Sequence, residues 1–227
     1  MHEELKFAAL IKTCTKKKDL YTGRKLHADI HKRCLLQRSP YLGNTLISMY
    51  IKCGLLAQAE QVHEELSLRN VITWNALISG YAHHGKSNEA LNCLEQMQRE
   101  GISPNVVTFT CILTACSKAG DIGSGEEIHE EIVSRGLLRK DIVLDNALVN
   151  LYAKCGMLEK AQQVLERILI RNVVTWASLI AGYAQQGQCD EALSCFNRMQ
   201  NEGISPDAIV FSCIVKACGK SRDIKKG

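Results

Sequence analysis

The sequence repeats itself at a fixed interval of 102 residues. Trp74 and Trp176 are separated by this interval, and the stretch VITWNALISGYAHHG (71–85) around the first recurs around the second as VVTWASLIAGYAQQG (173–187). The same interval separates other matched residues, among them Cys53 and Cys155, Pro104 and Pro206, and Asn44 and Asn146. A long fixed period is typical of stacked repeats. We therefore expect one elongated array whose core runs between neighbouring repeats.

Each interval contains three repeats of unequal length, with 36, 31 and 35 residues. The predicted repeats are 4–39, 40–70, 71–105, 106–141, 142–172 and 173–207, followed by a partial repeat at 208–227. The partial repeat stops where a second helix should begin, and it lacks the polar outer face of a terminal repeat. We therefore expect the chain to be part of a longer array.

The apolar residues predict two helices in each repeat. In the repeat 71–105, Trp74, Leu77 and Tyr81 recur at spacings of three and four residues, which places them on one face of a helix. Gly85 is expected to end this helix, and a second helix is expected to follow from about Ser87. The sequence contains no hairpin dipeptides and no strand-like alternation, so it predicts an all-α fold.

Composition excludes several classes of protein. The net charge of +4 permits a polyanionic partner without demanding one. No stretch approaches the 18 or so apolar residues of a membrane span, and the N-terminus lacks the features of a secretory signal or an organellar transit peptide. The eleven cysteines include no C-x-x-C pair, and most of them fall in apolar helical runs. We expect them to be reduced and to serve as small packing residues.

The lengths and motifs closely resemble pentatricopeptide repeats of the plant PLS class, in which L, S and P repeats alternate. The order here would be L, S, P, L, S, P and a partial L, and the string NALISGYAHHGKSNEALNCLEQMQREGISPN carries the resemblance in the first P repeat. The tetratricopeptide repeat, which binds peptides, is the nearest alternative, but it has a constant period of about 34 residues. The resemblance implies an α-solenoid, a right-handed superhelix of helix–turn–helix repeats.

The resemblance also implies recognition of single-stranded RNA, with one base read by each repeat. In the family, the fifth and the last residue of a repeat select the base. The pairs at these positions are Asn44 and Asn70, Asn75 and Asn105, Thr110 and Asp141, Asn146 and Asn172, and Ala177 and Asp207. The three asparagine pairs imply a pyrimidine, the threonine pair implies a weakly read guanine, and the alanine pair implies a weakly read purine. The N-terminus would lie toward the 5′ end of the RNA. Ala8 and Ser39 depart from the pattern at both positions.

Two further positions of the repeat carry recurring residue types. The second residue is apolar in the repeats from 40 onward: Tyr41, Ile72, Val107, Val143, Val174 and Ile209. The family resemblance implies that these residues clamp each base between neighbouring repeats, whereas the alternative is that they form the core between repeats. The thirteenth residue is a lysine in the L and S repeats: Lys16, Lys52, Lys118, Lys154 and Lys220. These lysines are predicted to contact phosphates; the alternative is that each complements the dipole of its own helix.

We find no sign of catalytic chemistry in the sequence. His63 and His129 begin H-x-E strings, but neither string is followed by the P-C-x-x-C of a zinc deaminase, and we expect both to lie on solvated helix faces. No phosphate-binding loop, nucleophile elbow or metal-ligand cluster appears. We therefore predict a protein that is not an enzyme, with no cofactor, no metal and no small-molecule substrate.

The resulting hypothesis is sequence-selective binding of single-stranded RNA in organellar RNA processing, such as C-to-U editing. The resemblance places the protein in a mitochondrion or chloroplast and allows proteins of an editing complex as further partners. The alternative is a helical scaffold that binds a peptide or an editing cofactor along the same surface. Because contact with phosphates is sensitive to salt, the ionic-strength dependence of binding separates the two hypotheses.

Overall fold

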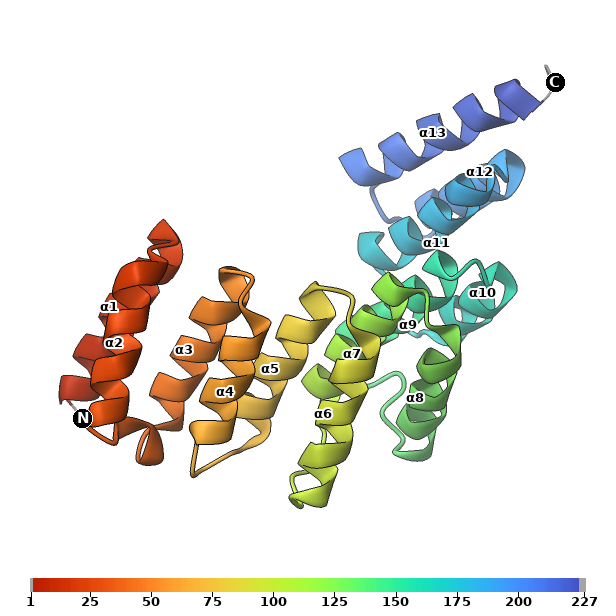
Figure 1. Ribbon diagram of the computed structural model, residues 1–227. Coiled ribbons are helices and arrows are strands. Elements are labelled where there is room, and N and C mark those ends of the chain that lie inside the picture. The colour runs from red at the N-terminus through yellow and green to blue at the C-terminus, as the bar shows by residue number, and fades with distance from the viewer. Residues whose placement is uncertain (1, 225–227) are drawn as a thin grey trace. The chain divides into compact units, whose positions relative to one another are not determined.

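The protein is all-α in the computed structural model, which describes residues 2–224 and the side chains of residues 3–219. No strand occurs in that part of the chain, as the sequence predicts. The helices are α1 (His2–Lys17), α2 (Leu20–Lys32), η1 (Leu35–Gln37), α3 (Pro40–Lys52), α4 (Leu56–Glu65), α5 (Val71–His83), α6 (Ser87–Arg99), α7 (Val106–Ala119), α8 (Ile122–Ser134), α9 (Ile142–Lys154), α10 (Leu158–Arg167), α11 (Val173–Gln186), α12 (Cys189–Asn201) and α13 (Ala208–Ile224). The fold is therefore that of a helical-repeat solenoid, in which an odd-numbered helix is the first of a repeat and an even-numbered helix the second (Figure 1).

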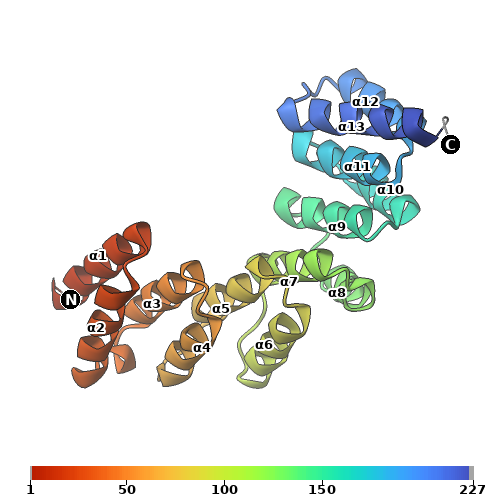
Figure 2. The same cartoon turned by 45° about the horizontal axis from the view of Figure 1, so that its top comes forward.

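The chain divides into two compact bodies, and the division falls inside α7. In the N-terminal body, Met1–Ala115, the first helices α1, α3 and α5 pack side by side in chain order (Figures 1 and 2). Each of them also packs against the second helix of its own repeat, which is α2, α4 or α6. The first helices thus form one row, and the second helices line one side of that row.

The C-terminal body, Cys116–Gly227, follows the same plan. Its first helices α9, α11 and α13 pack in sequence. The second helix α10 contacts α9 and α11, and α12 contacts α11 and α13, so each of these two helices packs against two first helices.

Glycines follow the helices α5 and α11, and the sequence predicts this for Gly85. Gly85 comes after α5 with φ of 68°, and Gly187 caps α11 with φ of 75°. Because glycine has no Cβ, it adopts this left-handed backbone at little steric cost. The chain can therefore leave one helix and enter the next within a few residues.

Asparagines begin the same two helices. Asn70 Oδ1 accepts hydrogen bonds from the backbone N–H groups of Ile72 and Thr73, at 3.0 and 3.1 Å, and Asn172 Oδ1 accepts from Thr175 N–H at 3.0 Å. The hydroxyls of both threonines accept the backbone N–H of the capping asparagine and so complete a capping box. The caps satisfy N–H groups that have no partner inside the helix.

The two repeated tryptophans occupy the interior of the two bodies. Trp74 in α5 and Trp176 in α11 are essentially inaccessible to solvent. Their indole Nε1 groups donate to Glu100 Oε2 at 3.3 Å and to Glu202 Oε2 at 3.1 Å, respectively. Each tryptophan thus buries a large apolar surface while its one polar group keeps a partner.

The prediction that His63 lies on a solvated helix face is wrong, whereas His129, for which the same was predicted, is partly exposed. His63, near the end of α4, is 2% exposed, and its ring packs edge-on against Trp74 with centroids 4.2 Å apart. The equivalent residue one interval later is the buried Leu165, so this is a core position of the second helix. His129 in α8 is partly buried, and its Nδ1 lies 2.8 Å from the hydroxyl of Tyr152.

Replacing His63 with leucine is expected to stabilise the protein most at acidic pH. Burial, followed by the charge of Arg69, lowers the pKa of His63 to about 4, and its Nε2 has no hydrogen-bond partner. An unfolded histidine has a pKa of about 6.5. The unfolded state therefore binds the extra proton between these values, and stability is lost as the pH falls through that window.

At about pH 5 this linkage costs the folded wild type about 2 kcal/mol. Urea unfolding of the wild type and His63→Leu at about pH 5 and about pH 7.5 measures the effect. The gain from leucine should be larger at the lower pH by about 2 kcal/mol. An equal gain at both pH values would mean that the buried imidazole accepts its proton without penalty.

All eleven cysteines are free thiols. Burial raises the pKa of Cys93 and Cys116 to about 12, which keeps these packing thiols protonated. The thiols of Cys189 in α12 and Cys218 in α13 lie 3.0 Å apart and share a hydrogen bond.

Candidate nucleic-acid interface

The residues predicted to select bases lie near the N-terminal ends of the first helices. The fifth residue of a repeat falls within the first two turns of α3, α5, α7, α9 or α11. The last residue of a repeat precedes the next first helix and accepts backbone N–H groups there. Where two successive first helices belong to one body, the fold therefore places the two members of a pair at the same end of adjacent helices.

In the N-terminal body the structure joins Asn75, Asn105 and Thr108 in one network. Asn75 Nδ2 donates to Asn105 Oδ1 at 3.1 Å, and the hydroxyl of Thr108 donates to Asn75 Oδ1 at 2.7 Å. Asn105 Oδ1 also accepts the backbone N–H of Thr108 at 3.1 Å. The two predicted base-selecting side chains of this repeat thus contact each other directly.

The C-terminal body contains the same network one interval later. Asn146 Nδ2 donates to Asn172 Oδ1 at 3.4 Å, and the hydroxyl of Thr175 donates to Asn146 Oδ1 at 2.5 Å. The backbone N–H of Thr175 donates to Asn172 Oδ1 at 3.0 Å. Two of the three predicted asparagine pairs therefore share the same hydrogen-bond arrangement.

The third asparagine pair, Asn44 and Asn70, is not joined in this way. Asn44 Oδ1 is buried and has no hydrogen-bond partner. The threonine of the following helix, Thr73, instead donates its hydroxyl to the backbone carbonyl of Asn70 at 2.8 Å. This repeat therefore has the residues of the network without its central hydrogen bond.

The other two predicted pairs offer fewer polar groups. Thr110 lies in the N-terminal body, where its Oγ1 is buried and has no hydrogen-bond partner. Asp141 lies in the C-terminal body and uses Oδ1 to accept two backbone N–H groups of α9, at 2.8 and 3.1 Å. Ala177 has no polar side chain, and Asp207 Oδ1 accepts the backbone N–H of Val210 at 2.9 Å.

The apolar second residues of the repeats are exposed rather than buried between repeats. Their exposed fractions lie between 46% and 63%. They are Tyr41, Ile72, Val107, Val143, Val174 and Ile209. Because they stand on the surface beside the paired residues, they are accessible to a ligand, and their contact with bases stays a prediction.

The lysines at the thirteenth position are exposed wherever their side chains are described. Lys16, Lys52, Lys118 and Lys154 lie in the last turns of α1, α3, α7 and α9. The side chain of Lys220 lies outside the described residues. An exposed lysine in a last turn can complement the helix dipole and also contact a phosphate, so its position is compatible with both roles.

Five of the predicted residues meet around one cavity in the N-terminal body. The cavity has a volume of 480 Å³, and Lys16, Tyr41, Asn44, Lys52 and Ile72 are among the residues that line it. Two apolar second residues, a fifth-position asparagine and two lysines thus share one concave site.

Sequence reasoning missed three polar residues of this surface. Lys12 donates to the hydroxyl of Tyr41 at 2.9 Å and also lines the cavity. Thr108 and Thr175 complete the two asparagine networks. The recurrence of threonine three residues after a capping asparagine was a visible signal, because it marks a capping box. That signal does not reveal the second hydrogen bond, to the fifth residue.

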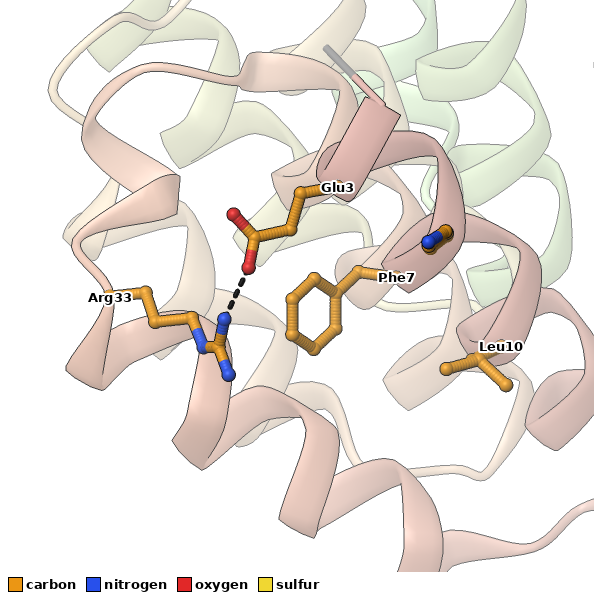
Figure 3. A pocket seen from close by; sticks show the side chains of 5 residues that line it. Glu3, Phe7, Leu10 and Arg33 are labelled. Carbon is orange, nitrogen blue, oxygen red and sulfur yellow. Dashed lines mark hydrogen bonds and ion pairs between the residues drawn. The ribbon is translucent and has the colours of Figure 1, made fainter.

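A larger cavity of 530 Å³ lies beside α1, and Figure 3 shows its lining. Glu3 forms an ion pair with Arg33, whose guanidinium carbon lies 5.6 Å from the centre of the Phe7 ring. Leu10 is half exposed at the same place. None of the predicted site residues lines this cavity, so we do not place the interface there.

Within the described residues, no histidine, cysteine, aspartate and glutamate side chains gather in a group of three or more that could hold a metal ion. Among the same residues, no helix combines the length and apolar character needed to cross a membrane.

Comparison with known proteins identifies the family. Two models of it match the chain: the PPR repeat family at residues 69–118 and 171–220, and the PPR repeat at residues 44–71, 107–137 and 146–173. The chain belongs to the pentatricopeptide repeat family.

Several relatives from Arabidopsis thaliana carry the family name. A mitochondrial pentatricopeptide repeat-containing protein is 33% identical over 99% of this chain, which spans 40% of that protein. A chloroplastic one is 32% identical over 99% of this chain, which spans 36% of it. The chain thus spans less than half the length of the curated relatives it matches.

Solved structures share the fold. PPR10 in complex with an 18-nucleotide psaJ RNA element matches 93% of this chain and 32% of its own, with a TM-score of 0.76 and 20% identity. The PPR domain of the Arabidopsis thaliana protein-only RNase P 1, in complex with tRNA, matches 75% of this chain and 92% of its own, with a TM-score of 0.58 and 18% identity. At these identities the likeness establishes the helical-repeat fold.

Proposed function

We propose that the protein binds single-stranded RNA in a sequence-selective manner as a PLS-type pentatricopeptide array, with one base read by each repeat. The observation that carries the proposal is the pairing of Asn75 with Asn105 and of Asn146 with Asn172. Each pair lies at the N-terminal ends of adjacent first helices, next to exposed apolar second residues. Structures of proteins with a similar fold have been solved in complex with RNA, which supports RNA as the partner.

The hydrogen bonds within the pairs determine which donors and acceptors are left for a base. Asn105 Oδ1 accepts from Thr108 and Asn75, and Asn75 Oδ1 accepts from the Thr108 hydroxyl. The network engages both carbonyl oxygens, Asn75 Oδ1 with one of its two lone pairs, and each amide keeps at least one N–H group to offer a base. The Watson–Crick edge of cytosine presents two adjacent acceptors, O2 and N3, whereas uracil carries an N–H between its two acceptors. We therefore propose that these pairs favour cytosine among the pyrimidines.

The two pairs that contain an aspartate would favour a different base. Asp141 and Asp207 each use Oδ1 for a backbone N–H and have an acceptor, Oδ2, as their other polar atom. Acceptors match the N–H groups of guanine, in keeping with a guanine read by Thr110 and Asp141. Ala177 contributes no hydrogen bond, so the repeat 173–207 should discriminate weakly.

The biological setting that we propose is organellar RNA processing, with C-to-U editing first. Relatives are named mitochondrial or chloroplastic proteins. In this setting the array acts without catalysis: it positions an RNA, while a deaminase performs the chemistry. Proteins of an editing complex are proposed as further partners.

The proposal predicts selective binding to one short RNA. The test RNA carries pyrimidine, pyrimidine, guanine, pyrimidine and purine in 5′ to 3′ order, and the control RNA has every position transversed. We expect tighter binding to the first by at least about tenfold, because two well-formed amide pairs contribute about 1–3 kcal/mol each to discrimination. Fluorescence anisotropy with labelled RNAs measures both affinities. Equal affinities would contradict base selection, and the absence of binding would favour a protein partner.

A further inference from the structure

We propose that Thr108 and Thr175 are positioning residues that hold the amides of Asn75 and Asn146 in one orientation. The inference rests on the proposed function, because its consequence is the choice between bases. The threonines themselves contact no base in this scheme. They act through the asparagines, whose oxygen atoms accept their hydroxyl protons at 2.7 and 2.5 Å.

An asparagine amide alone does not distinguish between bases that differ in the placement of donors and acceptors. Its carbonyl oxygen and its NH₂ group have nearly the same shape, and a half turn of the amide exchanges acceptor for donor. A fifth-position asparagine that is free to turn can meet either cytosine or uracil with a complementary group. Selectivity between the two therefore requires that something outside the amide fixes which end faces the base.

The capping asparagine supplies the first half of that constraint. The backbone N–H of Thr108 can only donate, so the atom of Asn105 that faces it must be the carbonyl oxygen. The atom of Asn75 that contacts this oxygen must then be Nδ2. The same chain of reasoning applies to Thr175, Asn172 and Asn146.

The threonine hydroxyl supplies the second half. Thr108 Oγ1 accepts the backbone N–H of Asn105 at 3.1 Å. Its own proton has two acceptors in reach, Asn75 Oδ1 at 2.7 Å and Asn105 Oδ1 at 3.1 Å, and the shorter contact is the one with Asn75. Thr108 and Thr175 are both completely buried, so water does not compete for that proton. A turned Asn75 amide would place its carbonyl oxygen against Asn105 Oδ1 and its NH₂ group against the Thr108 hydroxyl, which costs both orienting hydrogen bonds.

The chain contains a natural comparison in Thr73. It is also completely buried, and it closes the same capping box with Asn70. Its hydroxyl, however, donates to the backbone carbonyl of Asn70, and Asn44 Oδ1 has no hydrogen-bond partner. The repeat 40–70 should therefore distinguish cytosine from uracil less well than the repeats 71–105 and 142–172.

The test compares Thr108→Val with Thr73→Val. Valine keeps the branched shape, and each substitution removes one capping-box hydroxyl, so the loss of stability should be matched. Anisotropy with RNAs that carry cytosine or uracil at a single position gives the preference of each repeat. We expect Thr108→Val to reduce the preference for cytosine over uracil at the nucleotide read by Asn75 by about tenfold. This is the effect of leaving one hydrogen bond between uncharged groups unsatisfied. Thr73→Val should change the preference at the nucleotide read by Asn44 by less than about twofold.

The conservative variant Thr108→Ser restores the hydroxyl and should restore the preference, which a purely structural role of the methyl group would not do. An equal loss in Thr73→Val and Thr108→Val would overturn the inference. So would a cytosine preference in Thr108→Val that matches the wild type.

A second measurement needs no RNA and keeps the inference separate from the proposed function. In protein labelled with ¹⁵N at asparagine, the side-chain amide protons of Asn75 should exchange more slowly than those of Asn44. Thr108→Val should abolish that difference. If the wild type shows no base preference yet this protection is present, the proposed function fails and the orienting role stands. If Asn75 and Asn44 exchange alike in the wild type, the orienting role fails.

Discussion

RNA affinity is expected to fall by about 50-fold when the salt concentration is raised from about 50 mM to about 200 mM. The expectation follows from the four described thirteenth-position lysines, each of which would release counterions from one phosphate. A single-stranded contact contributes about 0.7 to the slope of log affinity against log salt, so four contacts give a slope of about −2.8. Anisotropy titrations at several salt concentrations measure the slope.

Single substitutions identify which lysines carry the effect. Lys154→Gln should reduce the magnitude of the slope by about 0.7 and weaken binding to every RNA sequence alike, because a phosphate carries no base information. Lys160 is a matched control, since it lies on the second helix α10 and forms an ion pair with Glu126. Lys160→Gln should leave the slope unchanged. If Lys154→Gln also leaves it unchanged, the lysine serves only the dipole of α9.

Much of the fold could be predicted because the same pattern of apolar residues and glycines occurs in several repeats. The 102-residue interval, the three- and four-residue spacing around Trp74 and the glycine at 85 lead to α5 and to the helix that follows it. The prediction of a solvated face for His63 was wrong, because the residue is buried against Trp74. Its alignment with Leu165 at the same interval identifies a core position, so the correct interpretation was present in the pattern.

The orientation of the amides could not be predicted. Thr73 and Thr175 occupy equivalent places in nearly identical stretches, and both close capping boxes. One hydroxyl nevertheless donates to a backbone carbonyl and the other to the side chain of the fifth residue. The residue types of the two stretches do not determine that choice, because the same capping box allows either acceptor.

The role of the apolar second residues was ambiguous in the sequence for a similar reason. A base clamp and a core between repeats both require an apolar side chain, so the pattern Ile72, Val107, Val143 fits either. Exposure separates the two, because more than half of each of these side chains lies on the surface. The family resemblance supplied the role of base clamp, and the fold supplies the accessibility which that role needs.

Trp176→Ala is expected to destabilise the protein by about 3–5 kcal/mol. Trp176 is completely buried in α11, its Nε1 donates to Glu202, and the guanidinium of Arg198 lies 5.4 Å from its ring. Alanine removes these contacts and leaves a cavity between α11 and the helices that pack on it. In a repeat protein each unit is stabilised mainly by its neighbours, so the loss should spread to α9 and α13.

Urea unfolding followed by circular dichroism measures this change, and Trp176→Phe is the control. Phenylalanine keeps most of the apolar contact and loses the indole hydrogen bond, so it should cost about 1–2 kcal/mol. The alanine variant should weaken binding to all RNAs in proportion to the unfolded fraction, with no change in base preference. A changed preference in a fully folded Trp176→Ala protein would show that base reading depends on the core beneath the paired asparagines. In that case orientation of the amides would be a property of helix packing and not of the threonine hydroxyls alone.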